Sequence, residues 1–174
     1  MRRVFLAVLA LTLANYLAMA LWTLPRLTRA AGGLLPFDLR PLGYGYHEVR
    51  AYLAVLTAEG RETYLTVQHW LDTTYPALLA LSLVLALHLL LAPRRVWLAR
   101  AGSAVALAGA VFDYMENAAV AALLRTGVEG IDAGVADRAG VLTMAKSAAD
   151  AAAMTLLLGA VAVALWRRWN GGTR

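Results

Sequence analysis

Four apolar stretches constrain the fold of this chain more than any other feature, because each is long enough to cross a lipid bilayer as a helix. They lie at residues 4–24, 64–92, 101–124 and 140–166. The hydrocarbon core of a bilayer is about 30 Å thick and takes about 20 helical residues to span. The composition agrees, since 61% of the residues are hydrophobic. We therefore expect an all-α fold: one membrane domain, residues 1–174, in which four transmembrane helices form an antiparallel bundle.

Arginines flank the apolar stretches and predict their orientation. Three short basic segments would lie on one side of a four-span protein: Arg2 and Arg3, then Arg94, Arg95 and Arg100, then Arg167, Arg168 and Arg174. Short loops rich in Lys and Arg stay in the cytoplasm. We therefore expect both termini in the cytoplasm and the protein in the inner (plasma) membrane. The long first loop on the other side carries five arginines, which works against this orientation.

The first stretch has a second interpretation as a secretory signal peptide. The segment "MRRVFLAVLALTLANYLAMA" combines a basic start, an apolar centre and a small-residue A-M-A ending. Its removal would leave three spans. Because the chain begins at Met1, we expect the first span to be retained.

The loop between the first two stretches, residues 25–63, is expected to hold structure of its own. Apolar residues recur there at helical spacing and are followed by a glycine stop: Val49, Tyr52, Leu53, Leu56 and then Gly60. We predict a short amphipathic helix near residues 47–58. It would lie on the outer surface or over the mouth of the bundle.

Polar residues interrupt the apolar stretches, and helical spacing groups several of them. Asp113, Glu116 and Asn117 stand at i, i+3 and i+4 and share one helix face. Lys146 and Asp150 are four residues apart and share another face. An ionisable side chain facing lipid near the bilayer centre costs about 2.5–3.5 kcal/mol on insertion scales. These faces should therefore turn inward and meet.

The other stretches contribute polar residues at similar heights. A rise of about 1.5 Å per helical residue places them between mid-membrane and the outer interface. These further candidates for a binding site are Asn15, Tyr16, His69 and Asp72, with Arg61 reaching in from the first loop. We expect one polar, acidic pocket that opens outward in the outer half of the bundle.

Charge limits the chemistry of this expected pocket. Four carboxyls face one amine: Asp72, Asp113, Glu116 and Asp150 against Lys146. Such an imbalance needs relief, from protonated carboxyls, from loop arginines or from a bound cation. One interpretation is a membrane enzyme acting on a small amphipathic or lipid-like molecule. Asp113 and Glu116 would then be the catalytic acid and base, and Asn117 would orient the substrate.

Three alternatives stay open. The residues fit a non-catalytic protein that binds or transports a small cation or an amphipathic molecule. They fit a metal site of Asp113, Glu116 and Asp150 with His69 or His47, although no metalloenzyme spacing such as H-E-x-x-H is present. They also fit a structural scaffold whose polar residues only fix helix packing. The identity of any cofactor stays unknown.

Composition removes several other classes of function. The chain has no cysteine, which excludes disulfides, thiol catalysis and cysteine metal sites. The net charge is +5, but the basic residues form no single stripe and no recognition motif, so we expect no nucleic-acid partner. The expected partners are the lipid bilayer and a small lipid-like molecule. Formation of a homo-oligomer is left open.

Two segments, "FDYMENAAVAALL" and "GYGYHEVRAYLAVLTAEGR", resemble uncharacterised bacterial four-span membrane proteins. Those proteins carry a D-Y-x-E-N element in the third span and a G-Y…GR…Y…D…P arrangement before and into the second. The matching positions are Asp113, Tyr114, Glu116, Asn117, Gly45, Tyr46, Gly60, Arg61, Tyr64, Asp72 and Pro76. This resemblance implies four spans and no activity. In architecture alone, acidic residues inside a four-helix membrane bundle are also similar to the sterol isomerase and sigma-2 receptor superfamily.

Overall fold

The computed structural model of the chain describes residues 1–171, which are helical with short connections and contain no strand. The expectation of an all-α fold is confirmed for these residues. Arg174, counted above among the basic residues, lies outside them. Three of the described helices are long and apolar enough to cross a membrane: Arg2–Ala30, Ala58–Thr126 and Ala133–Asn170.

The first of these is a rod of three consecutive segments. α1 (Arg2–Ala18) continues through the π-helical turn η1 (Met19–Thr23) into α2 (Leu24–Ala30). Pro25 does not break the rod: it follows the π-helical turn η1 closely, and the helix continues through it to Ala30. The helix therefore extends six residues beyond the apolar stretch that ends at residue 24.

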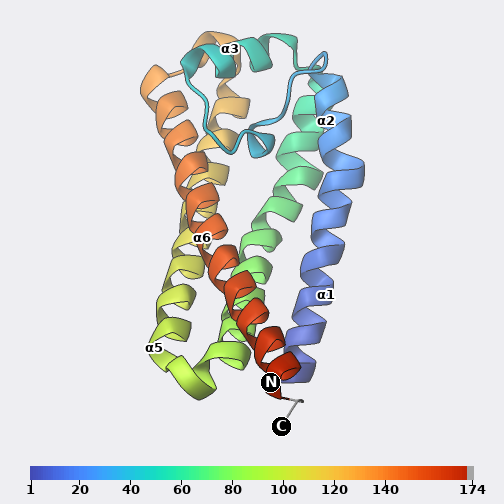
Figure 1. Cartoon of the computed structure of the whole chain (residues 1–174). Coiled ribbons are helices and arrows are strands. Elements are labelled where there is room, and N and C mark those ends of the chain that lie inside the picture. Colours follow the sequence, from blue (N-terminus) through green and yellow to red (C-terminus); the bar gives the residue numbers. More distant parts are fainter. Residues whose placement is uncertain (172–174) are drawn as a thin grey trace.

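The second long helix is bent back on itself. α4 (Ala58–Thr63) and the π-helical turn η3 (Tyr64–Gln68) lead into α5 (His69–Thr126), and the 69 residues of this run would be about 100 Å long if straight. Arg95 interrupts α5 with φ −144° and ψ 67°, two residues after Pro93. Figure 1 shows α5 reversing its direction at the lower end of the picture. We call residues 69–94 the first arm of α5 and residues 96–126 the second arm.

The third long helix is α6 (Ala133–Gly171), which follows the short turn η4 (Val128–Gly130). It starts seven residues before the expected span because Asp132 caps it, with its side chain accepting a bond of 2.8 Å from the Val135 backbone N–H group. α5 ends at Thr126, and the next residue, Gly127, has a φ of +71°, which suits glycine and stops the helix. α6 packs mainly on α5, and α1 packs on α5 as well.

The two ends of the bundle differ in character. In Figure 1 the N-terminus, the bend of α5 and the last turns of α6 lie at the same end. The basic residues Arg2, Arg94 and Arg167 are therefore at this end. A folded loop covers the opposite end. It contains the short turn η2 (Phe37–Leu39) and the helix α3 (Tyr46–Val55), and we call residues 31–56 the cap.

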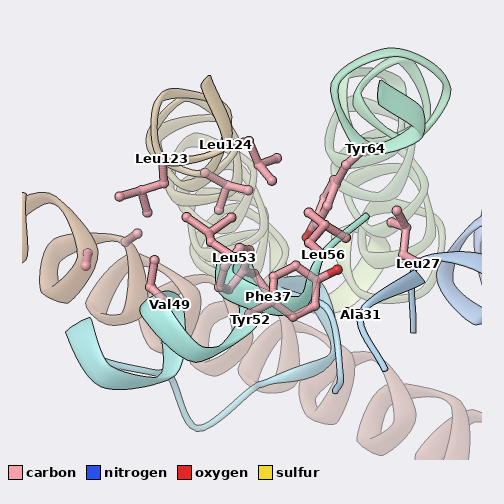
Figure 2. Close-up of a cluster of buried hydrophobic side chains, with 13 residues drawn as sticks. Leu27, Ala31, Phe37, Val49, Tyr52, Leu53, Leu56, Tyr64, Leu123 and Leu124 are labelled. Atoms are coloured by element: carbon pink, nitrogen blue, oxygen red, sulfur yellow. The ribbon is translucent and has the colours of Figure 1, made fainter. Parts of the chain in front are cut away.

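The cap holds the largest buried apolar cluster of the described residues. Figure 2 shows side chains from the cap meeting others from α2, α5 and η3. The labelled members are Leu27, Ala31, Phe37, Val49, Tyr52, Leu53, Leu56, Tyr64, Leu123 and Leu124. Gly60 was expected to stop the loop helix. α3 ends before it, at Val55, and Gly60 lies inside α4. A side chain at Gly60 would come within 2.6 Å of the Ala30 Cβ atom.

The sides of the long helices are apolar and exposed. Examples are Leu21 at 75% exposure, Leu158 at 62% and Leu165 at 61%. Monomeric soluble proteins rarely leave such large apolar surfaces uncovered. The surface of the bundle is that expected of a membrane protein.

Candidate functional site

The site begins at Pro76, which lies inside α5 and keeps its helical conformation. Proline has no N–H group, so the carbonyl four residues earlier, that of Asp72, loses its helical partner. Asn117 replaces this partner: its Nδ2 group donates to the Asp72 carbonyl at 2.9 Å. The asparagine of the D-Y-x-E-N element thus binds the two arms of α5 together at the point that the proline leaves open.

The neighbouring carbonyls also accept side-chain bonds. Asn15 on α1 donates to the Leu71 carbonyl at 3.3 Å and to the Thr74 hydroxyl at 2.5 Å. Tyr114 on the second arm donates its hydroxyl to the Thr73 carbonyl at 2.9 Å. The backbone carbonyls of Leu71, Asp72 and Thr73 therefore each accept a hydrogen bond from a side chain of another segment. Asn15, predicted as a binding residue, holds α1 to α5 in this arrangement.

Lys146, the only lysine of the chain, connects α6 to the second arm. Its Nζ atom lies 3.1 Å from an oxygen of Asp113 and forms a closer ion pair with Glu116. All three side chains are at most 12% exposed. The sequence placed both carboxyls on one helix face, and the structure brings them together on one buried amine. Buried charges require such a partner.

Glu116 has a second partner on α6. The Thr143 hydroxyl donates to its other oxygen at 2.5 Å, and both residues are fully buried. The Tyr44 phenol of the cap lies close to this pair. Burial raises the pKa of Tyr44 well above its usual value, and the nearby Glu116 carboxyl adds to the rise. The cap therefore adds a neutral phenol to the carboxyl–amine cluster.

Asp72 lies on α5, one helical turn after Gln68, and is bonded to the junction of two π-helical turns. Gln68, at the end of η3, donates to the Asp72 carboxyl at 2.8 Å and accepts from Thr23 at the end of η1. Gln68 and Thr23 are fully buried. Because π-helical turns are rare and occur often at functional sites, we include this junction in the candidate site.

Asp150 lies one helical turn from Lys146 on α6. One of its oxygens is 2.5 Å from the position that a Cβ atom on Gly109 would occupy, so the missing side chain of Gly109 makes room for this carboxyl. Asp150 remains partly exposed. Tyr16 on α1 is half exposed and packs its ring 6.2 Å from that of Tyr75.

A small cavity joins the cap to these residues. Its volume is about 10 Å³, about the room of one water molecule. Its polar lining consists of Asp38, Tyr64, His69, Asp72 and Asn117. Asp38, on η2 of the cap, accepts a bond of 2.6 Å from the Tyr64 hydroxyl. Asp113 and Glu116, the expected catalytic pair, do not line this cavity.

The cap closes the end at which we expected an open pocket. Phe37 of η2 packs its ring 4.7 Å from that of Tyr44 and 4.9 Å from that of Tyr52. Burial also raises the pKa of the Tyr52 phenol above its usual range, and the Asp38 carboxyl contributes. This end is closed because residues 31–45, whose sequence has no helical periodicity, fold across the bundle and bury the ring of Phe37.

Arg61, an expected binding residue, and His47, a residue of the metal-site alternative, lie elsewhere. The Arg61 guanidinium group lies against Gly127, with Nη1 3.2 Å from the position of a Cβ atom there, and so is not among the carboxyls. His47 is exposed on α3, and its ring lies edge-to-face with that of Tyr46 at a centroid distance of 5.5 Å. Within residues 1–171 no group of three or more His, Asp or Glu side chains could hold a metal ion. The residues of the metal-site alternative therefore do not form a metal-binding group in this part of the chain.

Sequence reasoning missed four residues of the site: Thr23, Asp38, Gln68 and Thr143. Three of them are neutral polar residues in apolar helices, where such residues are too common to be singled out. Asp38 lies in a loop whose path no periodicity predicts. The spacing of Thr143 and Lys146 at i and i+3 was a usable signal, because it places both on one face of α6.

Comparison with family models, with curated proteins and with solved structures finds no match to this chain.

Proposed function

We propose that this chain is an integral membrane protein with four membrane-spanning helices, and that it binds the cationic head of a small amphipathic molecule in the acidic site beneath the cap. The length of α5, its break at Arg95 and its reversal support two crossings by its two arms. Basic residues lie at the end of the bundle that holds the bend of α5 and the N-terminus. They favour a location of this end on the cytoplasmic side of the inner membrane. α3 then covers the outer end with its apolar face inward.

The observation that carries the ligand proposal is the charge of the site. Five carboxyls lie in or beside it, and one amine faces them: Asp38, Asp72, Asp113, Glu116 and Asp150 against Lys146. Lys146 is bound to Asp113 and Glu116. No hydrogen bond or ion pair within residues 1–171 connects a cationic group to Asp38 or Asp72. A ligand ammonium group would supply the missing charge at these two carboxyls.

The cavity beside Asp72 is the size of one water molecule, so it suits an ammonium head and no larger group. The remainder of an amphipathic ligand would lie outside it, and entry of the head requires the cap to move. Asp72, Asp38, His69 and Asn117 are the residues that would contact the head. The ion-paired cluster of Asp113, Glu116 and Lys146 would lie next to the bound head.

The test is native mass spectrometry of the purified protein with two probes of equal chain length, a primary alkylamine and the corresponding alcohol. We expect the wild type to retain one amine and little alcohol. Asp72→Asn should lose this preference, because it keeps an oxygen for the bond from Gln68 but removes the charge. Glu129→Gln is the matched control, since Glu129 is exposed and does not line the cavity.

Equal retention of the amine and the alcohol would contradict the proposal, and so would an unchanged preference in Asp72→Asn. Retention of sodium or potassium in place of the amine would support instead the small-cation alternative. Mass spectrometry of molecules that co-purify with the protein is a second, independent test. It should find an amphipathic amine in the wild type that is absent from Asp72→Asn.

A further inference from the structure

A groove of about 580 Å³ lies between the bend of α5 and the last turns of α6, at the end of the bundle opposite the cap. Its volume is in the range of small-molecule sites. Leucines and valine form its walls, and three arginines form one end of it. The main lining residues are Leu91, Leu98, Leu156 and Val163, with Arg94, Arg95 and Arg167.

The groove matches one leaflet of a bilayer in length. Along α6 it extends from Thr155 to Arg167, which is about 18 Å at the helical rise. Half of a hydrocarbon core of about 30 Å is close to this value. Trp97 and Trp166, which are 64% and 65% exposed, flank the arginine end. Since exposed tryptophans gather at the level of lipid headgroups, the arginines lie at that level and the apolar walls lie deeper.

The three guanidinium groups are available to an anion. Arg94, Arg95 and Arg167 are exposed, and no hydrogen bond or ion pair engages them within residues 1–171. Planar guanidinium groups bind phosphate oxygens through paired hydrogen bonds. Three of them at one end of an apolar groove complement a molecule with an anionic phosphate head and an aliphatic tail.

We infer that this groove binds one anionic phospholipid of the leaflet at the end where the N-terminus lies. Its phosphate contacts Arg94, Arg95 and Arg167, and an acyl chain lies against the leucines of α5 and α6. This inference rests on the membrane-spanning arrangement proposed above, and it is independent of the acidic site beneath the cap.

The experiment uses the full chain in mixed-lipid nanodiscs, released for native mass spectrometry. The two lipid probes are phosphatidylglycerol and phosphatidylcholine with identical acyl chains. We expect one retained phosphatidylglycerol per chain. Each arginine near the headgroup should contribute about a fivefold preference over phosphatidylcholine.

Charge variants test the arginines one at a time. Arg167→Gln should reduce the preference for phosphatidylglycerol about fivefold. Arg168→Gln is the matched control, because Arg168 is its exposed neighbour and does not line the groove. An equal loss in both variants would overturn the inference, since general surface charge would then explain the binding.

A filling variant tests the apolar part. A Cβ atom added to Gly159 meets nothing within 4 Å, and Gly159 lines the groove, so the side chain of Gly159→Leu starts in open space and can extend into the groove. We expect loss of the retained lipid in Gly159→Leu and no loss in Ala162→Leu, which is exposed outside the groove. Unchanged retention in Gly159→Leu would overturn the inference.

An excess of inorganic phosphate separates a lipid site from a simple anion site. Phosphatidylglycerol should stay bound, because its acyl chain contributes to the affinity. Displacement by inorganic phosphate at millimolar concentration would overturn the assignment to a lipid. Loss of the alkylamine preference in Asp72→Asn with retained phosphatidylglycerol would show that the two sites are separate.

Discussion

Lys146 is the residue on which the buried polar core depends most. It is the only lysine of the chain, and both Asp113 and Glu116 lie against it in a region with little exposure. Breaking a buried ion pair from one side leaves an uncompensated charge, which costs more than the pair contributes.

We predict that Lys146→Met lowers the free energy of unfolding by about 3–5 kcal/mol, because Asp113 and Glu116 then face each other without a cation. Unfolding in detergent, followed by circular dichroism, measures this change. Adding Glu116→Gln to Lys146→Met should recover part of the loss, since the amide can still accept the bond from Thr143. An unchanged midpoint in the single variant would show that Lys146 carries no such role.

The residue-level prediction from sequence succeeded where helical spacing alone decides the outcome. Asp113, Glu116 and Asn117 share a face of one helix whatever it packs against. It did not reveal the partner of Asn117, the backbone carbonyl freed by Pro76, because that bond joins residues 45 positions apart. Nor did it show whether Lys146 would bind Asp150 on its own helix or the carboxyls of α5. That choice depends on how α6 packs.

At the scale of elements, the contact between the cap and α6 depends on a close approach of two backbones. A Cβ atom on Gly140 would collide with the Tyr44 backbone carbonyl, and one on Gly43 would lie 2.8 Å from the Gly140 carbonyl. Gly43 also has a φ of +84°, which few other residues adopt. The position of Tyr44 next to Glu116 follows from this contact.

We predict that Gly140→Ala destabilises the protein by about 1–3 kcal/mol, because the new methyl group forces the cap away from α6. Limited trypsin digestion should then cut faster at Arg40 and Arg50 in the cap. Gly159→Ala is the control on the same helix: nothing surrounds its Cβ position, so it should gain up to about 1 kcal/mol from helix propensity. Equal digestion rates in the two variants would contradict the assigned contact.

Sequence patterns predicted the long elements better than their ends. The apolar runs on either side of Arg95 were visible because hydropathy falls at the Pro93–Arg100 segment. The π-helical turns η1 and η3 were not, since an inserted residue in a helix leaves no mark in composition. Residues 31–45 were also out of reach, because aromatic burial fixes their path and local periodicity does not.

At the scale of the whole molecule, the number of crossings made by α5 decides the topology. If α5 crosses twice, the cap and the start of α6 lie on one side of the membrane. A single crossing would place them on opposite sides. Because the chain has no cysteine, a single cysteine can be introduced and labelled at any chosen position.

We predict that a membrane-impermeant maleimide labels Leu42→Cys and Ala133→Cys from outside the cell, and that Val96→Cys reacts only after the membrane is opened. Leu42 is 90% exposed, Ala133 is exposed and Val96 is 46% exposed, so access through the protein is not limiting. Opposite labelling of Leu42→Cys and Ala133→Cys would contradict the four-span arrangement. Labelling of Val96→Cys alone would keep four spans and reverse the orientation.

The solitary lysine makes the buried core chemically addressable. Apart from a free terminal amine, an acylating reagent finds a single primary amine in the chain, and that amine is buried between the carboxyls of Asp113 and Glu116. The rate at which Lys146 is acylated therefore reports how often the molecule opens transiently. The mass of the intact protein gives this rate without any engineered label.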